Sequence, residues 1–323
     1  MLIGKHEFKH GLMLAPMAGF TDRAMRVVCH GEGCEVSVTE MISAKAVVYN
    51  DKKTYKLARI MPDEGPVLLQ IFGSEPAVMA EAACRLSLPV DSSAAAPIGI
   101  DINMGCPVHK IFSNGEGSAL MRSPNLIYDI VKSVSNATIL PTTVKMRLGI
   151  DSKSINVIEC AKAAEEGGAS LLTVHGRTRA QLYSGKADWN AIAKVKESLQ
   201  IPVIANGDIL TAADAVRALE ITGADGIAIG RGAVGNPFVF GEITAALEGR
   251  EYVSPSLDGR IALALTQLTV ASEEKGEEVA VREARKQIAQ YFHSFRGAAE
   301  LRAEINRALT VAEVKAAIEK LEK

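Results

Sequence analysis

The stretch IPVIANGDILTAADAVRALEITGADGIAIGRG, residues 201–232, contains one complete strand–helix–strand unit. Two short apolar runs, at 201–208 and 226–232, flank an amphipathic segment that Thr211 can cap at its start. Runs that are apolar almost throughout are typical of parallel strands buried on both faces. The stretch therefore predicts an α/β fold with a parallel sheet.

The same alternation of strand and helix patterns extends over the first 248 residues. Six further strand candidates precede these two, at residues 12–19, 35–40, 67–73, 99–105, 142–149 and 171–177. Eight strands with following helices in about 250 residues are the pattern of a TIM (β/α)8 barrel. A doubly wound sheet is the alternative, but it usually has fewer strands and a glycine-rich turn after the first. We expect the barrel over residues 1–248.

The pattern changes after the proline-containing link at 251–256. The rest of the chain has no strand-like run, and it predicts three or four helices broken at Gly276, Gly297 and Thr310. We therefore expect a separate, all-helical domain over residues 249–323.

The composition is that of a globular protein, with 48% hydrophobic and 23% charged residues. Glycine, proline or a charge interrupts every apolar run well before the length of a membrane span, and the start shows no signal-peptide segment. Five cysteines without a CxxC pair indicate reduced thiols and argue against a zinc site. We expect a cytoplasmic protein with no membrane association, no metal and no obligatory protein partner.

The charge balance limits how nucleic acid can be bound. With 36 basic and 38 acidic residues the formal net charge is −2, so such binding has to rely on local basic patches. One patch lies in the middle of the helical region, around Arg282, Arg285 and Lys286. Runs of this kind are most often a solvated helix face, and the composition alone does not separate the two interpretations.

Polar, charged or glycine residues follow nearly every predicted strand. In a TIM barrel the carboxyl ends of the strands meet at one mouth, where the chemistry takes place. Each group alone has an ordinary structural explanation, but their common position indicates a polar ligand bound over the mouth. In chain order they are Pro16, Met17, Ala18, Glu40, Gln70, Asn103, Cys106, Lys145, Arg147, His175, Asn206, Gly207, Asp208, Gly230 and Arg231.

Glycines follow the seventh and eighth strands, in NGDI at 206–209 and GRG at 230–232. Backbone N–H groups at these two positions form the usual phosphate site of the barrel. The pattern therefore predicts a phosphorylated cofactor whose ring lies toward Gln70, Lys145 and His175. A lysine there would favour the negative charge of a reduced flavin ring, and an amide would suit its pyrimidine edge.

Cys106 lies between Gly105 and Pro107, at the predicted end of the fourth strand. As a structural thiol it would need no special neighbours. As a nucleophile it would need a lowered pKa and an adjacent base, and His109 lies three residues further on. As a general acid it would need to keep its proton, which the ordinary cysteine pKa of about 8.5 already allows. The residues alone leave all three roles open.

The motifs together resemble the tRNA-dihydrouridine synthase family, in particular its bacterial B-type branch. They cover the whole barrel in order, and the helical region matches more loosely through 277–287 and 300–306, with Gln287 where many relatives carry histidine. The barrel motifs are APMAGFTDRAMR (15–26), TEMISA (39–44), QIFGS (70–74), DINMGCPVHK (101–110), NGEGSALM (114–121), VKMRLG (144–149), TVHGRTR (173–179), VIANGDI (203–209) and GADGIAIGRGAVGNP (223–237).

The resemblance implies a barrel that binds FMN and a helical domain that binds tRNA. It implies reduction of a tRNA uridine to 5,6-dihydrouridine, with NADPH as the usual reductant and NADH as a second option. Cys106 would donate a proton, Asn103 would hold the uracil, and Arg282, Arg285 and Lys286 would contact the tRNA. The residues that would line the flavin are Pro16, Met17, Ala18, Gln70, Lys145, His175, Asn206, Gly207, Asp208, Gly230 and Arg231.

This chemistry gives Cys106 a specific task. Hydride transfer from the flavin to C6 of uracil would leave an enolate, which a thiol on the opposite face could protonate at C5. The target base has to be extruded from the folded tRNA, and the helical domain could hold the RNA backbone meanwhile.

Two other functions fit the barrel less well. A flavin barrel of the dihydroorotate or dihydropyrimidine dehydrogenase kind would act on a free base, and it would not need a helical domain rich in arginine. An RNA-binding module without catalysis would have no reason to keep the NMGCP and VKMR sequences intact.

Overall fold

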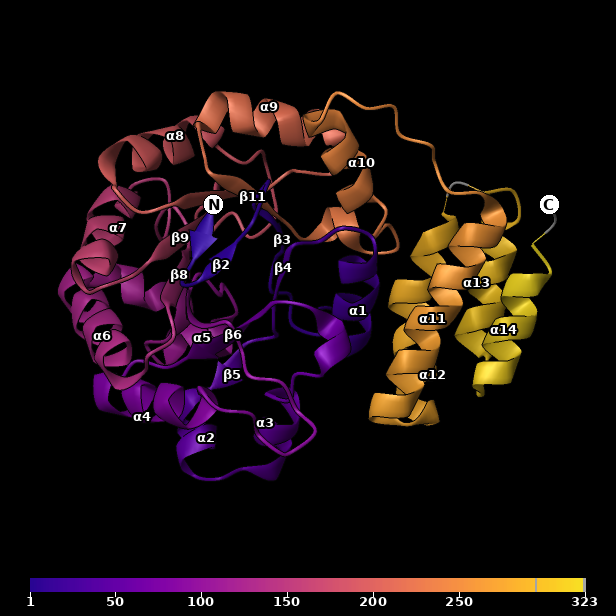
Figure 1. Cartoon of the computed structure of the whole chain (residues 1–323), viewed down its shortest axis with the longest axis horizontal. Helices are drawn as coiled ribbons and strands as arrows, with labels where there is room; N and C mark the ends of the chain where they lie inside the picture. The colour runs from indigo at the N-terminus through magenta and orange to yellow at the C-terminus, as the bar shows by residue number, and fades with distance from the viewer. Residues whose placement is uncertain (294, 322–323) are drawn as a thin grey trace.

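The computed structural model describes residues 1–293 and 295–321. Eight parallel strands form a closed barrel, because β11 pairs with β3 and β4 pairs with β6. The predicted TIM barrel with a C-terminal helical domain is confirmed (Figure 1). In chain order the barrel strands are β3 (Leu12–Leu14), β4 (Val36–Val38), β6 (Val67–Phe72), β7 (Gly99–Met104), β8 (Thr142–Met146), β9 (Leu171–His175), β10 (Val203–Asn206) and β11 (Gly226–Ile229).

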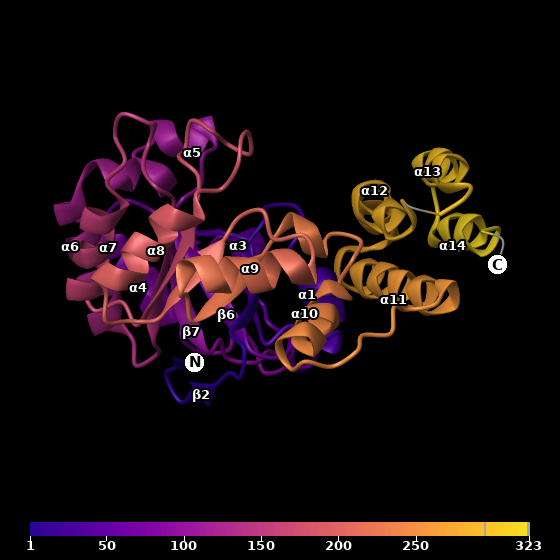
Figure 2. The same cartoon turned by 90° about the horizontal axis from the view of Figure 1, so that it is seen from above.

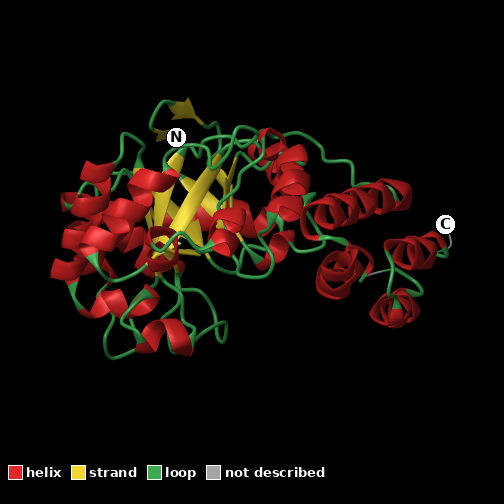
Figure 3. Ribbon diagram, turned by 90° about the horizontal axis from the view of Figure 1, so that it is seen from below, coloured by secondary structure: helices red, strands yellow, loops and turns green. Residues whose placement is uncertain are grey.

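Helices surround the strands, as the red ribbons around the yellow barrel show (Figure 3). The helix start expected at Thr211 carries a cap, since Thr211 accepts from the Asp214 N–H, and Asp22 likewise accepts from the Met25 N–H. The helices of the barrel are α1 (Arg23–Gly31), α4 (Pro76–Leu86), α6 (Pro124–Ala137), α7 (Val157–Glu166), α8 (Trp189–Ser198), α9 (Ala212–Thr222) and α10 (Val239–Leu247). Shorter elements are β5 (Ile42–Ser43), α2 (Ala44–Val48), α3 (Lys52–Leu57) and α5 (His109–Ser113).

Side chains alternate between the two faces of every strand, and this divides the core in two. Outward residues such as Leu69, Ile102 and Val144 pack against the helices. Inward residues such as Leu68 and Ile204 fill the barrel itself. Both faces of each strand are therefore buried, which explains why the strands are apolar at nearly every position.

A hairpin of β1 (Leu2–Ile3) and β2 (His6–Glu7) covers the amino end of the barrel (Figure 2). Ile3 is fully buried and packs with Met13 and Leu68 in the inner core. The hairpin closes the end of the barrel opposite the mouth.

The helical domain consists of α11 (Leu257–Lys275), α12 (Glu277–Gln287), α13 (Ala298–Arg307) and α14 (Val311–Glu319). The breaks fall where the sequence predicted them, because Gly276 separates α11 from α12, Gly297 precedes α13 and Thr310 caps α14. The apolar core of this domain includes Ala24 and Phe238 of the barrel. No helix within the described residues is long and apolar enough to span a membrane.

A buried chain of hydrogen bonds links the helical domain to a loop at the barrel mouth. The Tyr291 hydroxyl donates to Gln267 Oε1 (2.6 Å), and Gln267 Nε2 donates to Gln287 Oε1 (2.6 Å). Gln287 Nε2 in turn donates to the Gly19 carbonyl (3.3 Å). The Lys275 ammonium also bonds to Asp22, so two polar links hold the domain against the start of α1.

We expect Tyr291→Phe to destabilise the protein by about 1–3 kcal/mol, because it leaves the buried Gln267 oxygen without a donor. The shift of the urea midpoint at unchanged m-value measures this. Tyr252→Phe is the matched control, since its half-buried hydroxyl makes only a 3.4 Å contact with the Phe238 carbonyl. Equal urea midpoints for the two variants would contradict a stabilising role for this chain of hydrogen bonds.

Candidate active site

A cavity of about 540 Å³ opens at the carboxyl ends of the barrel strands. Its lining contains every barrel residue that the sequence analysis assigned to a cofactor, together with Asn103, Cys106 and Arg147. The cofactor candidates in its wall are Pro16, Met17, Ala18, Gln70, Lys145, His175, Asn206, Gly207, Asp208, Gly230 and Arg231. Glu40 lies outside this lining and accepts a hydrogen bond from the Gly19 N–H.

Strand alternation explains why these side chains point into the cavity. Residues two positions after an inward apolar residue also point inward, so Leu68 is followed by Gln70 and Ile204 by Asn206. The parallel register then sets them side by side, with Asn206 opposite His175.

The amide of Gln70 lies between the side chains of Asp101 and Asn103. Its Nε2 donates to Asp101 Oδ2 (2.7 Å), and its Oε1 accepts from Asn103 Nδ2 (2.7 Å). Thr143 Oγ1 donates to the other Asp101 oxygen (2.5 Å). Asn103 Oδ1 accepts from the N–H groups of Cys106 (2.9 Å) and Gly105 (3.2 Å). These side chains form a relay of hydrogen bonds, which runs from the buried carboxylate of Asp101 through Gln70 and Asn103. It ends at the backbone N–H groups of Gly105 and Cys106, in the loop that we call the cysteine loop.

Asp101 fixes the direction of this relay. In its ionised form the carboxylate can only accept hydrogen bonds, and Gln70 accordingly turns its NH₂ toward Asp101. The Gln70 oxygen then faces Asn103, which has to turn its NH₂ toward Gln70 and its oxygen toward the loop. Burial raises the pKa of Asp101, while the donors of Thr143 and Gln70 and the charge of Lys145 oppose that shift.

The thiol of Cys106 lies at the wall of the cavity and is half-buried. Burial raises its pKa, while the backbone at Val108 and the charges of Arg147 and Lys145 act in the opposite direction. The thiol is therefore protonated at neutral pH. Ser118 holds the loop from behind, because its hydroxyl donates to the Cys106 carbonyl (2.8 Å).

Lys145 brings a buried positive charge into the cavity, and the Asp101 carboxylate acts on it without direct contact. Its ammonium has no hydrogen-bond or ion-pair partner in the part of the chain that the structure describes. Burial and the neighbouring Arg147 lower its pKa to about 8. The same burial, with the charges of Lys145 and Arg147, lowers the pKa of His175 far below its ordinary range, so this imidazole is neutral.

The far end of the cavity is formed by the loops after β10 and β11. Gly207 has φ +119°, and a Cβ there would lie 2.8 Å from the Ala187 Cβ and 2.9 Å from the His175 ring. The buried Arg177 holds the next residue, with its Nη2 at 2.7 and 2.8 Å from the two oxygens of Asp208. Arg231 lies on the other side of Asp208 at 3.3 Å. This end of the cavity therefore combines the closely packed backbone of Gly207 and Asp208 with the half-exposed guanidinium group of Arg231.

A family model for dihydrouridine synthase matches residues 13–323. The chain belongs to the dihydrouridine synthase family. A probable tRNA-dihydrouridine synthase of Rickettsia conorii is 40% identical over 94% of this chain and 91% of the relative. A tRNA-dihydrouridine synthase B of Pseudomonas aeruginosa is 40% identical over 94% of this chain and 90% of the relative. The resemblance to this family and to its B-type branch is confirmed.

Among solved structures, a histamine dehydrogenase from Rhizobium sp. 4-9 superimposes with a TM-score of 0.57. The match covers 83% of this chain and 50% of that one, at 14% identity. At this identity the likeness concerns the fold alone.

Several residues of this cavity and its support were not singled out from the sequence, although Met41, Asp101 and Arg177 lie inside the quoted family motifs. Met41, Leu182 and Tyr183 line the cavity from loops, where apolar side chains follow no period. The relay residue Asp101 lies within a strand, and Arg177 resembles any loop arginine. For Asp101, a charged residue inside an otherwise apolar strand is the one feature that could have indicated a buried partner.

We expect Lys145→Met to stabilise the ligand-free protein by about 3 kcal/mol at pH 7, because a desolvated charge is removed. The folded pKa of about 8 lies below the ordinary 10.5. The penalty is therefore complete below about pH 8 and disappears as the pH rises to 10.5. Urea midpoints of both proteins between pH 7 and 10 should converge. A lower midpoint for the variant at pH 7 would disprove this.

Alkylation tests the protonation state of Cys106 against another thiol of the same chain. Cys84 is exposed, whereas burial raises the pKa of Cys106. Because the thiolate is the reacting form, iodoacetamide at pH 7 should modify Cys84 roughly tenfold faster or more. Peptide mapping by mass spectrometry follows both sites. Faster modification of Cys106 would instead indicate an activated nucleophile.

Proposed function

We propose that this protein reduces specific uridines of tRNA to 5,6-dihydrouridine, with FMN as its bound cofactor and NADPH or NADH as the electron source. One observation carries the proposal: a protonated thiol and an unpartnered lysine line the same cavity at the mouth of the barrel. The first suits proton donation, and the second suits an anionic ring.

The cavity wall fits FMN at both ends. At one end the backbone of Asn206, Gly207 and Asp208, with Gly230 and Arg231, would hold the phosphate. A side chain at Gly207 would clash with His175, so that position is kept for close approach of backbone. At the other end Pro16, Met17, Ala18, Gln70, Lys145 and His175 would surround the ring.

Bound FMN would supply a hydride to C6 of the uracil. Negative charge then spreads to the C4 carbonyl, and C5 has to gain a proton. The Cys106 thiol is the group that would deliver it, because it is neutral before the step. The charges of Arg147 and Lys145 favour the thiolate that remains.

Asn103 would contact the uracil through its NH₂ group. Its oxygen already accepts two backbone N–H groups, and one amide hydrogen goes to Gln70. The second hydrogen faces only the Met41 sulfur at 3.8 Å, which is a weak acceptor. We therefore assign Asn103 as a donor to a uracil carbonyl.

The helical domain would hold the tRNA through the basic side of α12. Arg282 and Lys286 are exposed on this helix. Arg285 is half-buried and donates to the Ala308 carbonyl (3.3 Å), so it would act from a fixed position. All three would bind phosphates.

We expect Cys106→Ala to keep its flavin and to accept electrons from NADPH at the normal rate. Reoxidation of the flavin by tRNA should slow by about 10²–10⁴-fold, because the general acid is missing. Single-turnover absorbance of the flavin separates the two half-reactions. Cys84→Ala is the control, since it removes an exposed thiol far from the cavity lining.

Reoxidation by tRNA at the wild-type rate in Cys106→Ala would refute the assigned role. A protein that binds no flavin, or that reduces free uracil or orotate but not tRNA, would refute the proposed function itself.

A further inference from the structure

Two arginine side chains meet on one aromatic ring beside the cysteine loop. The guanidinium carbon of Arg179 lies 3.7 Å from the centre of the Phe112 ring, and that of Arg122 lies 4.4 Å from it. Two guanidinium groups do not fit over one face of a ring at such distances. Phe112 is therefore held between them, and cation–π attraction fixes both charges.

Three segments of the chain build this stack. Phe112 belongs to α5, which begins three residues after Cys106. Arg122 ends the short 3-10 helix Gly117–Arg122, and Arg179 lies in the loop after β9. We call Arg122, Arg179, Phe112 and Lys110, which belongs to the same short helix as Phe112, the rim cluster.

The positive charge of the rim cluster is not compensated. Within the described residues, none of the cationic groups of Lys110, Arg122 and Arg179 forms an ion pair. The Nε of Arg179 is buried and has no hydrogen-bond acceptor there. By contrast, Arg23 and Arg26 of the barrel do have acidic partners, in Asp63 and Glu64. Two guanidinium groups fixed on one ring, with no carboxylate in an ion pair with either of them in the described part of the chain, indicate an anionic ligand.

The rim cluster stands at the mouth side of the barrel. Helix α5 rises on the side opposite the β1–β2 hairpin, and α12 and α13 of the helical domain rise on that same side (Figure 2). The cluster and the basic helix α12 therefore flank the mouth from two directions.

We propose that the rim cluster is a second phosphate-binding surface for tRNA, which holds the RNA backbone on the thiol side of the mouth. This inference rests on the proposed function. Lys110 and Arg122 are exposed, and no cluster residue lines the cavity. Small molecules bind in concave sites, whereas an open surface of fixed cations suits the backbone of a polymer. The observations thus favour RNA over the phosphates of NADPH.

The test replaces the charges one at a time and together, with Arg122→Gln, Arg179→Gln and the double variant. Binding of tRNA should weaken roughly tenfold per substitution at low salt, and the slope of log K against log[salt] should fall by about one for each phosphate that is no longer bound. Phe112→Leu keeps the charges but removes their platform. It should weaken binding with an almost unchanged slope.

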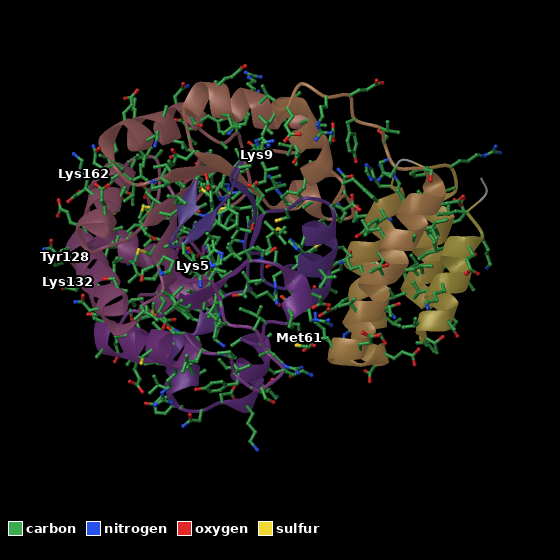
Figure 4. All side chains as sticks on the ribbon, in the orientation of Figure 1. Lys5, Lys9, Met61, Tyr128, Lys132 and Lys162 are labelled. Atoms are coloured by element: carbon green, nitrogen blue, oxygen red, sulfur yellow. The ribbon has the colours of Figure 1, made fainter. Side chains whose placement is uncertain are left out.

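Lys132→Gln and Lys162→Gln are matched controls. Both lysines lie on the outside of the barrel, on α6 and α7, at the edge farthest from the helical domain (Figure 4). They remove the same charge without touching the mouth, so their tRNA affinity and salt slope should equal those of the wild type. The flavin spectrum and the thermal midpoint of each variant report whether it is folded.

Three results separate the possibilities. Unchanged tRNA affinity and slope in folded Arg122→Gln and in the double variant would overturn the inference. A raised KM for NADPH with normal tRNA binding would also overturn it, and would assign the cluster to the reductant. Failure of the wild-type chain to bind or reduce tRNA would overturn the proposed function instead, which the same titration detects before any variant is compared.

Discussion

The alternation of side chains along eight parallel strands is the constraint on which the rest of this structure depends. Each strand has to fill the barrel with one set of residues and cover it with helices through the other. The inward-facing positions continue to the mouth with the same two-residue period. There Gln70 follows the core residue Leu68, and Asn206 follows Ile204. The inner core and the cavity wall are therefore both formed by the inward-facing residues of the same strands.

Positive charge collects at the mouth although the whole chain carries a formal charge of −2. Lys145 and Arg147 lie in the cavity wall and form no ion pair within the described residues. The guanidinium group of Arg147 donates to backbone carbonyls such as that of Gly105. Such an arrangement costs folding free energy in the absence of a ligand. A protein that keeps it has a site shaped for anions, and its stability and its binding capacity oppose each other.

The fold and the barrel residues of the cavity lining could be predicted from the sequence, because both follow from the two-residue alternation of side chains along a strand. Gln70, Lys145 and His175 could be located by counting from apolar runs to strand ends. Met41 and Tyr183 were missed, because they enter the cavity from loops whose course depends on tertiary contacts. The stack on Phe112 was missed as well, since cation–π contacts join segments that nothing in the sequence pairs.

The buried carboxylate of Asp101 has a further consequence for the order of the site. Were a neutral amide to stand there, donor and acceptor could exchange at every link, and a second arrangement of the relay would become possible. Only one of the two arrangements offers an oxygen to the backbone of Cys106. A group that only accepts removes the second arrangement and favours the one in which Asn103 holds the backbone of Cys106.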